Sequence, residues 1–122
     1  MAFGINRVGQ IVGASQASGD GPHHAFLFTE GAMIDLGTLG GTASQADAIS
    51  SRGLVVGWSR IPSGEQHAFL WSSGQMLDLN RLANIGGGIW LEEATAINDI
   101  GQVVANANNG HAYLIALPLP PP

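Results

Sequence analysis

One tract of the chain occurs three times, and this repetition restricts the fold more than any other feature. The first copy, AFGINRVGQIVGAS at Ala2–Ser15, returns as ADAISSRGLVVGWS at Ala46–Ser59 and as ATAINDIGQVVANA at Ala94–Ala107. A second motif, His-Ala-Phe-Leu or a close variant, follows each copy, at intervals of 43 and 44 residues. It begins at His24, His67 and His111. A period of about 20–50 residues indicates a repeat architecture.

The repeats define the expected domain organisation. We expect one repeat domain over residues 1–117, with units at about 2–45, 46–93 and 94–117. The chain then continues as a proline-rich tail over residues 118–122. Because proline cannot donate a hydrogen bond to a neighbouring strand, we expect this tail to leave the sheet.

Turn signals divide each repeat into short strands. Asn6–Gly9, Ser50–Gly53 and Asn98–Gly101 each begin with a short polar residue and end with glycine, which is typical of a type I turn. We therefore expect a hairpin around each of them. A second hairpin is expected around the glycine that follows the His-Ala-Phe-Leu segment. The intervening runs of four to six residues are rich in Val, Ile, Phe and Trp, as strands are.

These strands are apolar on both faces, which indicates sheets packed between two neighbours. In His67–Trp71, one face carries Ala68 and Leu70, and the other carries His67, Phe69 and Trp71. Strands buried on both sides belong to stacked sheets, and small four-stranded sheets stacked around an axis are the blades of a β-propeller. The expected fold is all-β, with about three blades in the chain.

Three blades are too few to close a ring, since propellers have about four to eight. We therefore expect self-association into a dimer or larger ring, with the strand Ala2–Asn6 of one chain completing the sheet of His111–Ala116 in another. The alternative is a β-trefoil, which has three four-stranded repeats and is monomeric.

Composition excludes several classes of partner. Only 11% of the 122 residues are charged and the net charge is −5. All four basic residues are arginines, so the basic surface that binds nucleic acid or membranes is not expected. No signal peptide or membrane-spanning run is recognised. Cysteine is absent, and no cofactor is implied.

Three motifs together resemble the bacterial HAF-repeat family, named after the triplet His-Ala-Phe. They are Ala-x-x-Ile-Asn-x-x-Gly-x-Val-Val-Gly, His-Ala-Phe-Leu-Trp and the stretch Asp35–Gly41, DLGTLGG. The resemblance covers about residues 2 to 116, and the chain is similar to the C-terminal part of longer members of the family. It implies a propeller-like fold and an extracellular or cell-surface location, and it brings no established activity.

The repeated histidines are expected to serve the fold. His24, His67 and His111 recur in every unit, as Asp35 and Asp78 do in two, so each is best explained by a bond within its own blade. No spacing typical of a metal site occurs, since His23 and His24 are neighbours and point to opposite faces of a strand.

Residues that interrupt the repeat are better candidates for function. The segment 81–93 is longer than its counterpart and contains Arg81, Trp90, Glu92 and Glu93. Aromatic rings stack on sugars, and two carboxyl groups about 5–10 Å apart can hydrolyse a glycosidic bond. Glu92 and Glu93 would diverge in a strand and would need a partner. The candidates for that partner are Asp47, Asp99 and Glu65.

Two loops differ between the copies and are expected at one rim, where binding sites are commonly placed. They are Gln16–His23, which contains Asp20, and Arg60–Gln66. The expected ligand-binding residues are Trp90, Arg81, His23, Asp20 and Glu65. The sequence thus favours a scaffold that binds a carbohydrate or a protein. The alternative is a glycoside hydrolase using Glu92, Glu93, Asp47 and Asp99.

Overall fold

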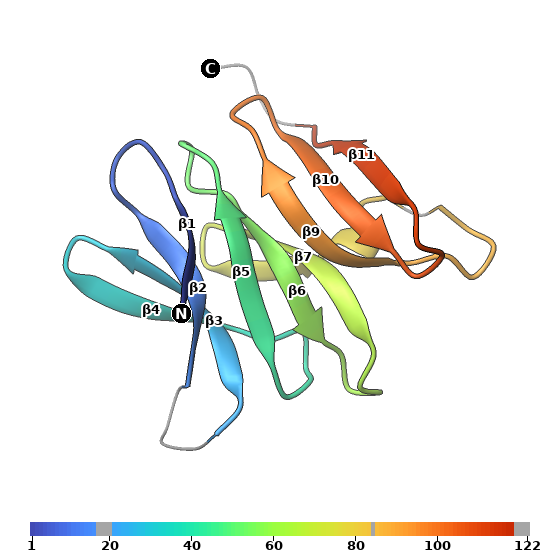
Figure 1. The fold of residues 1–122 in the computed structure, drawn as a ribbon, viewed down its shortest axis with the longest axis horizontal. Coiled ribbons are helices and arrows are strands. Elements are labelled where there is room, and N and C mark those ends of the chain that lie inside the picture. The colour runs from blue at the N-terminus through green and yellow to red at the C-terminus, as the bar shows by residue number, and fades with distance from the viewer. Residues whose placement is uncertain (17–20, 84, 119–122) are drawn as a thin grey trace.

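The chain forms three antiparallel β-sheets that lie side by side in an open arc (Figure 1). The computed structural model describes residues 1–16, 21–83 and 85–118. The first sheet contains β1 (Ala2–Ile5), β2 (Ile11–Gln16), β3 (His23–Thr29) and β4 (Ala32–Gly37). The second contains β5 (Ser44–Ile49), β6 (Val55–Arg60), β7 (Gln66–Ser72) and β8 (Gln75–Asp78). The third contains β9 (Leu91–Ile97), β10 (Gln102–Ala107) and β11 (Ala112–Ala116), and a 3-10 helix, η1 (Leu79–Arg81), precedes it.

The hairpins expected from the turn signals are present in every sheet. In the first turn of each unit the glycine N–H donates to the carbonyl oxygen three residues earlier. These bonds are Gly9 to Asn6, Gly53 to Ser50 and Gly101 to Asn98, at 3.0–3.2 Å. Each of these glycines has a positive φ of 82–84°, a conformation that glycine adopts at little cost. The turns therefore force the strands on either side of them to pair.

The first strands of the three sheets, β1, β5 and β9, contact one another in sequence, and we call them the inner strands. Each carries a β-bulge that leaves one residue without a partner in the ladder. The unpaired residues are Phe3, Asp47 and Thr95, which occupy the same repeat position. A second bulge in β9 falls at Glu92. Bulges re-aim side chains and are common next to functional sites.

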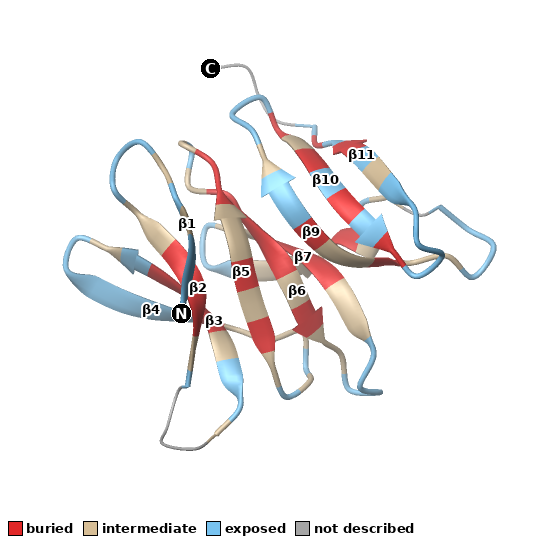
Figure 2. Ribbon diagram, viewed as in Figure 1, coloured by how far each residue is buried: buried red, intermediate tan, exposed pale blue. Residues whose placement is uncertain are grey.

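Two hydrophobic cores lie between the sheets (Figure 2). Phe69 is fully buried between the first and second sheets, and Leu91 is fully buried between the second and third. Burying a side chain of this size contributes about 2–3 kcal/mol. The expectation that the strands are apolar on both faces is confirmed for the second sheet, which contributes to both cores.

The connections separate into two ends of the arc. The tight hairpin turns after β1, β5 and β9 lie at one end, which we call the turn rim. The loops before β7 and β11 and the link from β4 to β5 lie at the other end, the loop rim (Figure 1). At the turn rim neighbouring sheets are joined by hydrogen bonds. The Asn6 amide donates to the carbonyl oxygen of Ser50 at 3.0 Å, and the Ser51 N–H donates to Asp99 at 2.8 Å.

These sheets have the blade-like arrangement predicted from the sequence, and they are three separate sheets instead of one trefoil barrel. Within the chain, β1 pairs with β2 and is an edge strand of the first sheet. The expected pairing of Ala2–Asn6 with His111–Ala116 of a second copy stays a prediction. The third sheet has three strands among the described residues, and β11 is its edge. No helix in the described part of the chain is long and apolar enough to cross a bilayer.

Candidate functional site

Two carboxyl groups meet where the second and third sheets adjoin. Asp47 is the bulged residue of the inner strand β5, and Glu93 lies near the start of the inner strand β9. Hydrogen bonding with Asp47 is the largest influence on the pKa of Glu93, so the two side chains lie close together. Both residues are half-buried. The sequence placed these two residues among the candidate carboxylates, and the structure brings them together.

Asp47 has one oxygen that is satisfied and one that needs a proton donor. Oδ1 accepts a hydrogen bond of 2.8 Å from the side-chain amide of Gln45 on the same strand. Oδ2 is buried and receives no N–H or hydroxyl donor from the described residues. A protonated Glu93 carboxyl supplies such a donor. Gln45 and Glu93 occupy the same position in two different repeats. Asp47 therefore interacts with a glutamine amide from its own sheet and with the corresponding glutamate from the next sheet.

Close contact with Asp47 changes the acidity of Glu93. The hydrogen bond to Asp47, burial and the negative charge of Asp47 together raise the pKa of Glu93 from 4.5 to about 7. Two carboxylates this close cannot both ionise cheaply, so one proton is retained between them. At neutral pH the pair therefore presents both a donor and acceptors within one small area.

The remaining carboxylates proposed from the sequence occupy other positions in the fold. Glu92 is adjacent to Glu93 and is the residue at the second bulge of β9. Asp99 lies at the turn rim, where hydrogen bonds from Ser51 lower its pKa. Glu65 is exposed in the loop before β7 and accepts a hydrogen bond from Ser63 at 3.1 Å. The structure therefore joins Glu93 to Asp47 and does not join it to Asp99 or Glu65.

Trp90 is held in place at the loop rim. Its indole ring packs against the His67 ring, with 6.1 Å between the centroids. Its backbone N–H donates to the Asn108 side chain at 3.0 Å. Nε1 of the indole is buried and has no hydrogen-bond partner among the described residues. The ring is half-buried, so part of it remains accessible beside the start of β9.

Two further ligand-binding candidates also lie at the loop rim. Arg81, at the end of η1, is exposed and lines a hollow of about 500 Å³ together with Thr38, Pro62 and Asp78. His23 is exposed at the start of β3. Asp20 lies outside the described residues. The loop rim therefore gathers Trp90, Arg81, His23 and Glu65 at one end of the arc.

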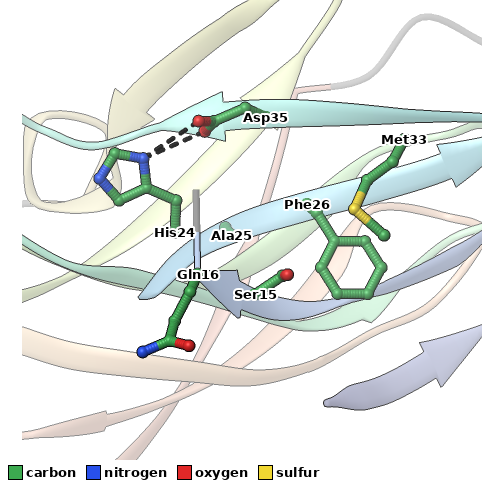
Figure 3. Close-up of a pocket in the computed structure, with 7 residues that line it drawn as sticks. All are labelled: Ser15, Gln16, His24, Ala25, Phe26, Met33 and Asp35. Atoms are coloured by element: carbon green, nitrogen blue, oxygen red, sulfur yellow. Dashed lines mark hydrogen bonds and ion pairs between the residues drawn. The ribbon is translucent and has the colours of Figure 1, made fainter. Parts of the chain in front are cut away.

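Two of the three repeated histidines, His24 and His67, pair with the repeated aspartates, and these pairs connect the third and fourth strands of their sheets. No side-chain bond of His111 is seen among the described residues. Nδ1 of His67 lies 2.7 Å from Asp78, and Nδ1 of His24 lies 3.2 Å from both oxygens of Asp35. The His24–Asp35 pair forms one end of a hollow of about 210 Å³ beside Phe26 (Figure 3). Within the described ranges, no three His, Asp or Glu side chains gather as a metal site would require.

Comparison with protein-family models, with curated proteins and with solved structures finds no match. The resemblance to the HAF-repeat family therefore rests on the sequence motifs alone. The geometry of the described residues carries the functional argument that follows.

Proposed function

We propose that this chain is a non-catalytic binding scaffold, and that the Asp47–Glu93 pair is the centre of a carbohydrate-binding site. The observation that carries the proposal is the buried Oδ2 of Asp47, which has no hydrogen-bond partner among the described residues and lies beside Glu93, whose pKa Asp47 raises. Side chains with strongly shifted pKa values are found at functional sites more often than elsewhere in proteins.

The chemistry of the pair suits a neutral ligand rich in hydroxyl groups. A sugar hydroxyl is both a donor and an acceptor. It can donate to the Asp47 carboxylate and accept from protonated Glu93 or from the Gln45 amide. Hydrogen bonds that involve one charged partner are stronger than neutral ones. Trp90, three residues before Glu93, adds an aromatic ring of the kind on which sugars pack.

The same contact argues against glycoside hydrolysis by this pair. Hydrolases hold their two carboxyl groups about 5–5.5 Å apart for retention, or about 6.5–9.5 Å apart for inversion. Asp47 acts on the pKa of Glu93 chiefly through hydrogen bonding, and carboxyls that share a hydrogen bond lie closer together than either separation. The pair therefore favours binding, with an acid that stays protonated as a donor.

An array of neutral oligosaccharides tests this proposal, followed by calorimetry on the best ligand. Asp47→Asn should weaken binding by tenfold or more, because the charged acceptor is lost. Glu93→Gln should weaken it less, because glutamine still donates. Glu30→Gln is the matched control, since Glu30 is exposed in the turn between β3 and β4 of the first sheet, and it should bind like the wild type. Failure to bind any sugar, or equal binding by all variants, would refute the proposal. Released sugar would show hydrolysis instead.

A further inference from the structure

The two end sheets of the arc expose residues whose repeat counterparts are buried between sheets. Val12 in the first sheet and Val56 in the second are both 0% exposed, whereas Val104 in the third is 39% exposed. Each valine pairs across its sheet with a leucine. The exposed fractions of these leucines are 4%, 6% and 66%, for Leu27, Leu70 and Leu114.

The first sheet shows the same pattern on its opposite face. Ile49 of the second sheet is packed in the core against the first sheet and is 8% exposed. Its counterpart Ile5, in the first sheet, is 68% exposed. Phe3, on the same strand, is 45% exposed. The arc therefore ends in two apolar faces, each of which repeats one half of an interface that already exists inside the chain.

Both end faces are hollowed and lined by uncharged residues. A hollow of about 340 Å³ on the first sheet is lined by Ala2, Phe3, Gly4, Ile5 and Ile11. A hollow of about 240 Å³ on the third sheet is lined by Ala96, Ile97, Asn98, Gln102, Val104 and Leu114. We call these the first-sheet face and the third-sheet face. Because none of the lining residues is charged, contact between the two faces would not bury a charge in an apolar environment.

The side-chain amide of Asn6 at the turn rim bonds to the next sheet, and its counterpart in the third sheet, Asn98, lacks that bond among the described residues. The side-chain Nδ2 of Asn6 donates both to Gln10 and to the carbonyl oxygen of Ser50 in the next sheet. Asn98 is the counterpart of Asn6, and its Nδ2 donates to Gln102 at 2.7 Å in the same way. In the described part of the chain, its second N–H has no acceptor in a following sheet.

We propose that the third-sheet face binds the first-sheet face of a second copy of this chain. Two copies joined head to tail at both ends would form a ring of six sheets, within the range of about four to eight that closed propellers have. Asn98 of one copy would then donate to the carbonyl oxygen of Asn6 in the other. This proposal concerns assembly and does not depend on what the Asp47–Glu93 pair binds.

The first test is the solution mass, measured by light scattering during size exclusion. The wild type should have twice the 12.6 kDa mass of one chain. Leu114→Arg and Ile5→Arg should each give a monomer, because a charge would be buried at the contact. Leu82→Arg is the matched control, since Leu82 is 47% exposed and lies after η1, away from both faces. A monomeric wild type, or a dimer that survives either variant, would overturn the proposal.

Mixing the two monomeric variants tests the head-to-tail direction. Leu114→Arg keeps an intact first-sheet face, and Ile5→Arg keeps an intact third-sheet face. An equimolar mixture should therefore form a heterodimer through one intact contact, although neither variant associates alone. If third-sheet faces bound each other instead, Ile5→Arg would dimerise by itself and mixing would add nothing. Circular dichroism of each variant checks that the single chain stays folded.

Discussion

Nδ1 of His67 donates to Oδ2 of Asp78 at 2.7 Å, while Oδ1 of the same carboxylate accepts the backbone N–H of Asn80 at 2.9 Å. The Asn80 side chain in turn forms two hydrogen bonds with the backbone of Leu91, at 2.7 and 3.0 Å. One half-buried aspartate thus connects β7, the start of η1 and, through Asn80, the start of the third sheet.

Asp78→Ala should lower the free energy of unfolding by about 2–3 kcal/mol, because it removes charge-assisted hydrogen bonds from a half-buried site. Asp35→Ala is the matched comparison. Asp35 pairs with His24 at 3.2 Å, and its side chain is 52% exposed, against 19% for Asp78. Its removal should cost less than about 1 kcal/mol. Urea unfolding of both variants measures the difference, and equal losses would contradict this account.

Glu93 should make the stability depend on pH in a specific direction. Its folded pKa of about 7 lies above the ordinary value of 4.5, so the unfolded chain releases this proton first as the pH rises. The stabilisation is therefore complete below pH 4.5 and is lost as the pH rises to about 7. Glu93→Gln keeps a donor and cannot ionise. Near pH 8 it should be more stable than the wild type by on the order of 1 kcal/mol, after allowing for solvent screening.

The comparison needs chemical denaturation at pH 5 and pH 8 for both proteins. The advantage of Glu93→Gln should appear at pH 8 and largely disappear at pH 5. Glu65→Gln serves as the control because Glu65 is exposed and lies in a separate loop. An advantage that is the same at both pH values would show that Glu93 does not retain its proton beside Asp47.

Gly57→Ala should destabilise the chain by about 3 kcal/mol. A Cβ at Gly57 would overlap the backbone of Gln45 and Ala46 on the inner strand β5. Gly64→Ala is the control. Its φ of 94° carries a strain cost of about 1 kcal/mol, but a Cβ there meets open space. Thermal unfolding of both variants distinguishes the steric overlap expected in Gly57→Ala from the backbone strain expected in Gly64→Ala. Similar unfolding midpoints would show that β5 can shift away from the added Cβ at little cost in free energy.

Ser44→Ala should cost about 1–3 kcal/mol. The fully buried Ser44 hydroxyl accepts the backbone N–H of Ala25 at 2.8 Å and donates to the carbonyl oxygen of Gly37. Without it, a buried N–H in the first sheet has no acceptor. Ser63→Ala, in an exposed loop, should have almost no effect. Hydrogen exchange should show faster exchange of the Ala25 amide in Ser44→Ala, and unchanged protection would contradict the prediction.

The sequence predicted the strands and hairpins well because their signals are local. Asn6, Ser50 and Asn98 each start a turn that closes by a hydrogen bond from a glycine three residues later. The pairing of β1 with β2 within the chain has the same physical reason. A four-residue turn makes its flanking strands pair, whereas the link over residues 38–43 is long enough to reach the next sheet.

The site was predicted in part. Sequence analysis named Asp47 as one of three possible partners for Glu93, but no spacing could single it out. Their contact depends on the bulge at Asp47 and on how closely β5 approaches β9, and neither is a local property of the chain. The second bulge, at Glu92, adds one residue before Glu93 and was not predicted. One signal was available in the sequence. The repeat position that holds glutamine at Gln45 holds glutamate at Glu93, and such a departure from the repeat marks a residue that the repeat fold does not require.

The division between turn rim and loop rim separates the parts of this chain that hold sheets together from the parts that tolerate change. At Ser50 and Ser51, backbone groups bond to neighbouring sheets, so added residues there would break those bonds. Residues 62–65 are exposed, and the space around Gly64 is open. A peptide inserted in that loop would break bonds of the loop itself, between Ile61 and Glu65 and between Gly64 and Ile61, and no bond between sheets among the described residues. It should therefore disturb the packing of the sheets less than an insertion at Ser50 or Ser51, which would make this chain a small carrier for foreign sequence.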